Sequence, residues 1–521
     1  MAAEDLAEDV NTYKIEFYTM KKILSILITI LSVTMMYSQN IEDGLRYSSD
    51  DLNGTARFKA MSGAFGALGG DFSSINVNPA GSSVFANSQV AVSLSNYNIK
   101  NKASYFGSTT QEKNNTLDLN QAGIVFILEN SDKNSDWKKF AFAINYDNKK
   151  NYANSVKSVG VNNNSVANYF LSYANGLDLN IVNGSQYNYA SLYFNEQQAN
   201  LGYTSFIINE ATNYSDTTRN YVSLVAAGGN YLQENFVETT GYNGKLSFNA
   251  SGQYKDKLYF GVNLNSHYID YTKSSSFYEN NSNNTSSTQY AIRSVTFLND
   301  LYAYGTGFSF QLGTIYKATK ELRLGVAYES PTWLRISEEL TQNAVGVRAT
   351  TTNSFDPDVA NPYPITMLYE PYKLQTPGKW TGSIAYVFNK KGLISFDYAM
   401  KDYSNITLKP KDTYIAENKE MSNLLDVSNE FRLGAEYKIR QVSLRGGYRF
   451  EQSPYKNGTT VGDLTGYSGG IGYNFGNTKL DLAYSFAQRD YNMSMFSQGL
   501  TDAAKINSKN NSISLTLVFE L

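Results

Sequence analysis

The chain of 521 residues contains no cysteine and only one histidine, His267. Without cysteine it can form neither disulfides nor thiolate metal sites, as suits a protein of the cell envelope. A single histidine leaves little scope for imidazole catalysis or for a site built from several histidines. The sequence therefore predicts no cofactor, no metal centre and no enzymatic activity.

The chain also lacks an excess of basic charge and any obvious linker between domains. Its 44 Lys and Arg residues are balanced by 47 Asp and Glu residues, and no basic cluster offers a footprint for nucleic acid. Only 9 prolines occur, and no Pro- or Ser-rich stretch divides a length that would normally make several soluble domains. We therefore exclude nucleic acid as a partner and expect one large structural unit.

Long apolar runs are missing, with one exception near the amino terminus. This run covers residues 23–37, follows Lys21-Lys22 and precedes Ser38. A short basic segment, an apolar core and a small residue form a secretory signal pattern, and the run is too short to span a bilayer comfortably. We expect a misassigned extension at 1–19, a signal peptide at 20–38 and a mature chain beginning at Gln39.

The chain is instead rich in aromatic residues that recur at alternate positions. It contains 42 Tyr and 28 Phe. In the last segment Ile513, Leu515 and Leu517 fall on one face, whereas Ser514 and Thr516 fall on the other. Such alternation, with abundant Tyr, Gly and Asn, is typical of strands that meet lipid on one side and water on the other. The sequence predicts an all-β, antiparallel transmembrane barrel in a Gram-negative outer membrane.

About fourteen such segments can be counted, which is an even number, as in bacterial outer-membrane barrels. They lie near 88–98, 120–129, 137–147, 239–254, 257–273, 292–317, 322–341, 372–389, 393–409, 428–439, 442–454, 463–475, 479–492 and 507–521. Short turns alternate with long polar loops, which predicts a barrel over 88–521 with its short turns in the periplasm. Within the longest loop, 148–238, the stretch 165–175 predicts either a short helix over the barrel mouth or a disordered loop.

Residues 54–81 have a different composition, with six glycines and five alanines. Small residues cannot form a packed strand face, but they let backbones approach closely, and Asn78-Pro79 is a turn signal. A flexible surface loop and a compact plug are both compatible with this composition. The blocks Ala56-Arg57, Ala60–Ala64 and Asn78–Gly81 resemble the amino-terminal hatch of FadL/TodX-type outer-membrane transporters.

The resemblance implies that residues 39–87 form a hatch inside a barrel of fourteen strands. It also implies passive uptake of fatty acids or aromatic compounds, with outer-membrane lipid and a small hydrophobic ligand as partners. The alternative is a plugged barrel that serves a larger outer-membrane complex, such as a secretion or assembly machinery, and binds other outer-membrane proteins. The hatch and gating residues expected from this resemblance are Arg57, Gly63, Gly66, Gly69, Asn78, Pro79, Ala80 and Gly81.

Charged residues of both signs occupy the predicted inward positions, since charge on the lipid face would be unfavourable. The arginines could bind the carboxylate of a substrate through paired hydrogen bonds. Alternatively, the charges could pair with one another and hold the plug. The candidates for ligand or plug contacts are Arg323, Arg432, Glu436, Arg445 and Arg449.

Ser266 directly precedes His267, and serine and histidine are the residue types that a serine–histidine hydrolase uses. Adjacent strand residues point to opposite faces, so these two side chains cannot form a nucleophile–base pair. Alternation places His267 on the lumen side. We therefore interpret His267 as a structural residue.

The third predicted strand, Trp137–Asp147, contains neither glycine nor proline. In the family that the chain resembles, an inward bend of this strand opens a side route into the bilayer. Bends and bulges in strands often use glycine or proline. The sequence of this strand therefore argues against a lateral route made by such a bend, and it leaves open a gap made in another way.

Overall fold

The computed structural model describes residues 40–132, 134–211, 215, 218–283, 291–349, 364–389 and 391–521. The predicted extension, signal peptide and mature start at Gln39 lie outside the described residues. Among the described helices, none is both long and apolar enough to cross a bilayer.

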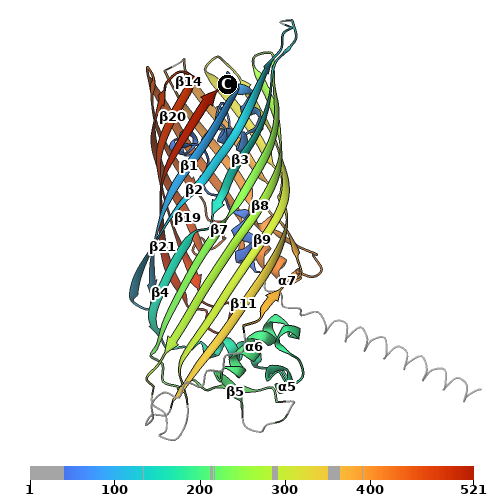
Figure 1. Cartoon of the computed structure of the whole chain (residues 1–521), viewed down its shortest axis with the longest axis vertical. Helices are drawn as coiled ribbons and strands as arrows, with labels where there is room; N and C mark the ends of the chain where they lie inside the picture. The colour runs from blue at the N-terminus through green and yellow to red at the C-terminus, as the bar shows by residue number, and fades with distance from the viewer. Residues whose placement is uncertain are drawn as a thin grey trace, which may run out of the picture.

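The described residues form one closed antiparallel barrel in which the last strand pairs with the first (Figure 1). Its strands are β1 (Gln89–Tyr105), β2 (Ser108–Glu129), β3 (Trp137–Asn151), β4 (Asn154–Asn162), β7 (Tyr231–Tyr254), β8 (Leu258–Asn280), β9 (Ala291–Lys317), β10 (Leu322–Glu329), β11 (Trp333–Ala349), β12 (Thr366–Leu368), β13 (Tyr372–Gln375), β14 (Lys379–Phe388), β15 (Gly392–Asp402), β16 (Thr407–Lys409), β17 (Val427–Ile439), β18 (Val442–Glu451), β19 (Val461–Asn474), β20 (Thr478–Ser494) and β21 (Ala503–Glu520). When strands interrupted along their length are joined, as β3 is with β4 and β10 with β11, the barrel has 14 strands. The predicted fold class is confirmed.

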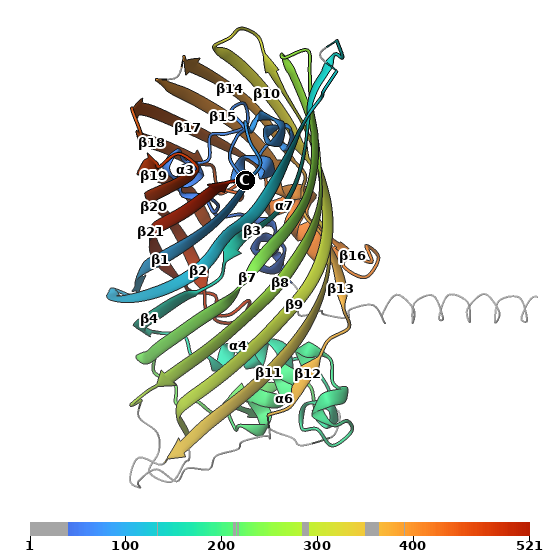
Figure 2. The ribbon, with the colours of Figure 1, turned by 45° about the horizontal axis from the view of Figure 1, so that its top comes forward.

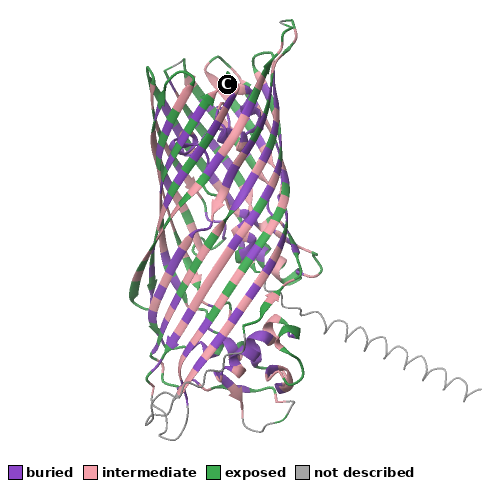
Figure 3. Ribbon diagram, in the orientation of Figure 1, coloured by how far each residue is buried: buried purple, intermediate pink, exposed green. Residues whose placement is uncertain are grey.

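Alternation along the strands separates a lipid face from a lumen face (Figure 3). On β21, Leu515 is 46% exposed, whereas Ser514 is fully buried. The apolar outward positions extend from Ile513 to Leu521, and the outward positions before them are the polar Asn511 and Lys509. A stretch of roughly nine residues is what one tilted strand needs to cross the hydrocarbon layer.

Several strands are longer than predicted because their outer ends leave the lipid. The predicted loop 99–119 is in fact a hairpin, in which β1 and β2 stay paired as far as Tyr105↔Ser108. β8 likewise continues to Asn280 and β11 to Ala349. Beyond the bilayer both faces of a strand meet water, so the apolar alternation disappears while the backbone hydrogen bonds continue.

The long insertion after β4 folds into a helical cap. It contains α4 (Ala167–Ala174), α5 (Leu179–Val182), η3 (Tyr189–Ser191), α6 (Phe194–Thr204), β5 (Ile208–Glu210) and β6 (Tyr221–Ser223). The predicted helix is α4, whose Phe170 packs against Phe297 of β9 and whose Tyr169 packs against Phe496 in the loop between β20 and β21. The cap lies at the end of the barrel opposite the carboxyl terminus (Figure 1), and the long loops make this the extracellular end.

The segment between residue 40 and β1 lies inside the barrel. It contains α2 (Ile41–Ser48), α3 (Ala56–Ala60), η1 (Ser73–Asn76) and η2 (Pro79–Val84), and Figure 2 shows α3 enclosed by strands near the short-turn end. On the extracellular side η4 (Tyr403–Asn405) and α7 (Ile415–Leu424) pack over α2, where Met421 contacts Gly44. We call residues 41–84 the hatch.

Candidate functional site: the hatch, the lumen and the interrupted wall

Glycines on both sides allow the hatch to lie backbone to backbone against the wall. A β-carbon added at Gly325 of β10 would collide with the carbonyl group of Gly66, and one added at Gly261 of β8 would collide with Pro79. Gly63 and Gly69 also adopt positive φ angles of 77° and 64°, which other residues rarely take. Glycine therefore provides both the turns and the close fit of the hatch.

The Asn78–Gly81 turn is buried and bonded to both the hatch and the wall. The side-chain nitrogen of Asn78 donates to the carbonyl oxygens of Gly66, at 2.7 Å, and of Thr314 on β9, at 2.9 Å. Its side-chain oxygen accepts from the backbone nitrogen of Ala80 at 3.1 Å. These bonds satisfy backbone groups that would otherwise be buried without partners. The turn thus fixes the hatch against β8 and β9.

A chain of ion pairs joins the hatch to the opposite wall. Arg57 Nε of α3 donates to Glu436 Oε2 at 2.9 Å, and Arg445 Nε donates to the same oxygen at 2.7 Å. Arg445 also pairs with Asp481 at 2.5 Å. The Glu436 side chain has no exposed surface, so its carboxylate is stabilised by the two arginines rather than by water. We call Arg57, Glu436, Arg445 and Asp481 the latch.

Two further wall residues bind hatch backbone. Arg323 donates to the carbonyl oxygen of Leu68 at 2.9 Å, and Asp397 accepts from the backbone nitrogens of Phe65 and Gly66 at 2.9 Å each. Of the other candidates, Arg432 pairs with Glu430 at 2.5 Å, and Arg449 is buried in the lumen. A role for any of these residues in gating or ligand binding stays a prediction.

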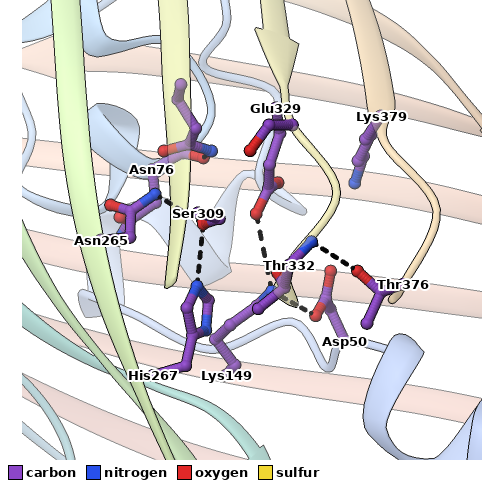
Figure 4. A network of polar contacts seen from close by, with 12 residues as sticks. Asp50, Asn76, Lys149, Asn265, His267, Ser309, Glu329, Thr332, Thr376 and Lys379 are labelled. Carbon is purple, nitrogen blue, oxygen red and sulfur yellow. Dashed lines mark hydrogen bonds and ion pairs between the residues drawn. The ribbon is translucent and has the colours of Figure 1, made fainter. Parts of the chain in front are cut away.

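Charged side chains of the hatch and the wall meet in the middle of the lumen (Figure 4). Asp50 lies 2.9 Å from Lys149 and 3.5 Å from Lys401, and Lys149 lies 3.6 Å from Glu329. The cavity among them measures only about 90 Å³, whereas a cavity of about 360 Å³ lies on the periplasmic side of the hatch. Asp50 and Lys149 lie outside the predicted strands, and Lys401 lies in the predicted segment 393–409 but is not among the candidate residues. The lumen is therefore narrow and polar at this level.

His267 is in the lumen, as alternation predicts, but its partner is Ser309 of β9 rather than its neighbour Ser266 (Figure 4). The ring nitrogen Nε2 lies 2.8 Å from Ser309 Oγ, which also accepts from Asn265 at 3.1 Å. Ser309 is fully buried, and the space beside His267 is about 10 Å³, roughly the volume that one water molecule needs. The pair is enclosed and has no room for a substrate.

The wall is interrupted between β2 and β4. The β2–β3 ladder ends at Gln121↔Asp147, and β4 pairs with β7. Within the described ladders, residues 108–120 of β2 pair with β1 and with no strand on their other side. β4 instead lies over the inner faces of β1 and β2, where Asn101 donates to Asn154 at 2.6 Å. Figure 1 shows β3 ending partway along the barrel, with β4 set below it.

This interruption corrects the prediction made from Trp137–Asp147. The chain turns inward immediately after that segment, at residues 148–153, without glycine or proline. The side chains of Asn148 and Asn151 both bind Asp118 Oδ2 of β2 and replace the backbone ladder there. A glycine contributes to the bend from the neighbouring strand β7. This residue, Gly241, has a φ angle of +108°, and its carbonyl oxygen accepts from Tyr152 N at 2.9 Å.

A barrel with a lipid face, a hatch in its lumen and an interruption of the wall between β2 and β4 is the architecture of an outer-membrane transport protein. The family model described as outer membrane protein transport protein (OMPP1/FadL/TodX) matches residues 189–520, more than half of the chain. The chain belongs to this family and is an outer-membrane protein.

Solved structures show the same fold at low sequence identity. A Pseudomonas aeruginosa FadL homologue is 14% identical with a TM-score of 0.52, covering 90% of this chain and 99% of its own. A Pseudomonas putida toluene transporter, TodX, is 14% identical with a TM-score of 0.51 and the same coverage. A comparison with curated proteins finds no match.

Neutralising the centre of the latch should loosen the hatch. In Glu436→Gln the cations Arg57 and Arg445 lose their buried partner, and breaking a buried ion pair from one side costs about 3–5 kcal/mol. We expect amide exchange in α3 to accelerate on the order of a hundredfold or more, the kinetic equivalent of about 3 kcal/mol.

The matched control is Glu451→Gln, because Glu451 pairs with Arg489 at 3.0 Å on the wall without a latch contact. It should leave α3 protected. The double variant Arg57→Gln, Glu436→Gln should recover part of the protection, since it also removes an unpaired cation. Equal exchange in Glu436→Gln and the native protein would show that the latch does not hold the hatch.

Proposed function

We propose that the protein lets small hydrophobic molecules, such as fatty acids or aromatic compounds, cross the outer membrane passively, and that they leave the barrel sideways between β2 and β4. The interruption of the wall between these strands carries this proposal. Along residues 108–120 of β2 no backbone ladder in the described wall joins β2 to β4, whose own ladder is with β7. The inner end of the interruption reaches the hydrocarbon layer, because Leu117 and Leu119 of β2 are exposed on the outer face there, so a molecule passing that end enters lipid directly.

The composition of the lumen favours a sideways exit over a straight one. The ion pairs of Asp50, Lys149 and Glu329 join the hatch to the wall in the middle of the lumen, and the latch lies on their periplasmic side. Displacing paired charges to admit an apolar molecule is unfavourable, because the charges would lose their partners and their water. Hydrophobic molecules gain free energy as soon as they contact lipid.

The similar solved structures agree with this class of cargo, since one of them is a toluene transporter. No observation favours the alternative of a structural subunit in a larger complex. Catalysis is not part of the proposal, because the enclosed Ser309–His267 pair has no space for a substrate.

Uptake by whole cells tests the proposal. Cells that make the protein should take up radiolabelled toluene and palmitate faster than cells with an empty vector, and both should take up a small sugar at the same rate. Equal uptake of the hydrophobic compounds would contradict the proposal, and faster uptake of the sugar would indicate a water-filled pore instead.

A further inference from the structure

The lipid-facing wall has an apolar groove near its periplasmic end. The groove has a volume of about 560 Å³ and crosses β15, β17 and β18. Its sides are the exposed side chains of Ile394, Tyr437 and Leu444, and its floor is Ala435 and Gly446. Ala435 and Gly446 are directly paired across β17 and β18, so two small side chains next to each other lower the surface of the wall.

The groove is empty space rather than a site of tight packing. A β-carbon added at Gly446 would have its nearest neighbour 4.0 Å away, at the carbonyl oxygen of Ser468. Gly446 is therefore not required for a close approach of the wall to the hatch, unlike the neighbouring Gly447, where a β-carbon would lie 2.5 Å from Met61. Because Ala435 and Gly446 face outward, the floor of the groove faces the membrane.

Basic residues border the groove at the membrane surface. Lys391, in the turn between β14 and β15, lines it directly, and its carbonyl oxygen accepts from Lys438 N at 2.7 Å. Arg440 lies in the next turn, between β17 and β18. Within the part of the chain that the structure describes, neither Lys391 nor Arg440 forms an ion pair, whereas Lys438 lies 3.7 Å from Glu436.

We propose that this groove binds one anionic phospholipid of the periplasmic leaflet. An acyl chain lies over Ala435 and Gly446 between Ile394, Tyr437 and Leu444, and the phosphate group meets Lys391 with Arg440 nearby. The groove opens toward the short-turn end, where the headgroups of that leaflet lie. Charge complementarity selects an anionic headgroup, because Lys391, which lines this edge of the groove, forms no ion pair among the described residues.

Photo-crosslinking in nanodiscs of phosphatidylethanolamine tests the site. The probe is phosphatidylglycerol carrying a diazirine on one acyl chain, and peptide mass spectrometry locates the label. We expect the label to concentrate on the peptides that contain Ile394, Tyr437 and Leu444. The same diazirine on phosphatidylethanolamine should label these peptides less.

Two variants remove the two halves of the site independently. Gly446→Leu fills the groove and should lower labelling about tenfold, the effect of losing contact with roughly two methylene groups. Lys391→Gln combined with Arg440→Gln should abolish the preference for phosphatidylglycerol while the groove remains. Gly469→Leu is the matched control, because Gly469 is the outward-facing partner of Gly446 on β19 but does not line the groove.

Heat-modifiable migration on gels verifies that each variant forms a barrel. Labelling spread evenly around the barrel, equal labelling by the two lipids, or unchanged labelling in Gly446→Leu would each overturn the proposal. The test does not depend on transport, so its failure would leave the proposed function untouched.

Discussion

Deletion of residues 54–81, with a short Gly-Ser linker joining Asn53 to Ser82, is expected to convert a closed barrel into a conducting pore. These residues include α3, η1 and the Asn78–Gly81 turn, which separate the cavity in the middle of the lumen from the periplasmic cavity. Once they are removed, the inward polar side chains line a water-filled channel, as in porins. Single-channel conductance in planar bilayers should rise from near zero to stable open steps.

The barrel itself should survive this deletion, because its wall is closed by strand pairs that do not involve the hatch. Some wall groups, such as Asp397 and Arg323, would exchange hatch partners for water, which the wider lumen could supply. Deletion of the loop residues 456–459, which lie on the extracellular side, is a control of similar surgery and should not open the pore. A folded deletion variant that stays closed would show that loops or side chains, rather than the hatch, block the lumen.

The sequence predicts those features of the strands, their identity and orientation, that contact with the bilayer determines. Inside the bilayer, Leu515 must face lipid and Ser514 must face the lumen, so a period of two identifies the strand and its orientation together. The same logic placed Glu436, Arg445 and His267 inside. The composition of residues 54–81 is compatible with a loop or a plug, and the structure has the plug, with Gly66 and Gly325 in close backbone contact.

The features that the sequence does not predict depend on the pairing register of the strands or on contact with water outside the bilayer. Alternation put Arg57 and Glu436 in the same lumen, but residues 379 positions apart meet only when the register of every strand is known. The sequence predicts a loop where β1 and β2 form a hairpin, because the outward residues of the hairpin are polar outside the lipid. The bend after β3 was missed because asparagine side chains, with Gly241 on the adjacent strand, take the role expected of a glycine or proline within β3.

Closing the gap between β2 and β4 should abolish uptake of hydrophobic molecules. Thr110 of β2 donates through its hydroxyl group to the carbonyl oxygen of Lys157 of β4, so the two residues are close enough for a short cross-link. The chain has no cysteine, and Thr110→Cys with Lys157→Cys therefore supplies its only thiols. A reducible bifunctional thiol reagent would join β2 to β4 across the interruption. The control pair, Lys102→Cys with Gln111→Cys, joins β1 and β2 where they are already paired.

The central claim is that cargo leaves through the wall, and uptake of radiolabelled toluene by cells carrying the Thr110–Lys157 cysteine pair tests it most directly. We predict that uptake falls to the rate of cells without the protein after cross-linking and recovers when a reductant cleaves the link. The control pair should transport at the native rate throughout. Undiminished uptake with the β2–β4 link in place would contradict the lateral route.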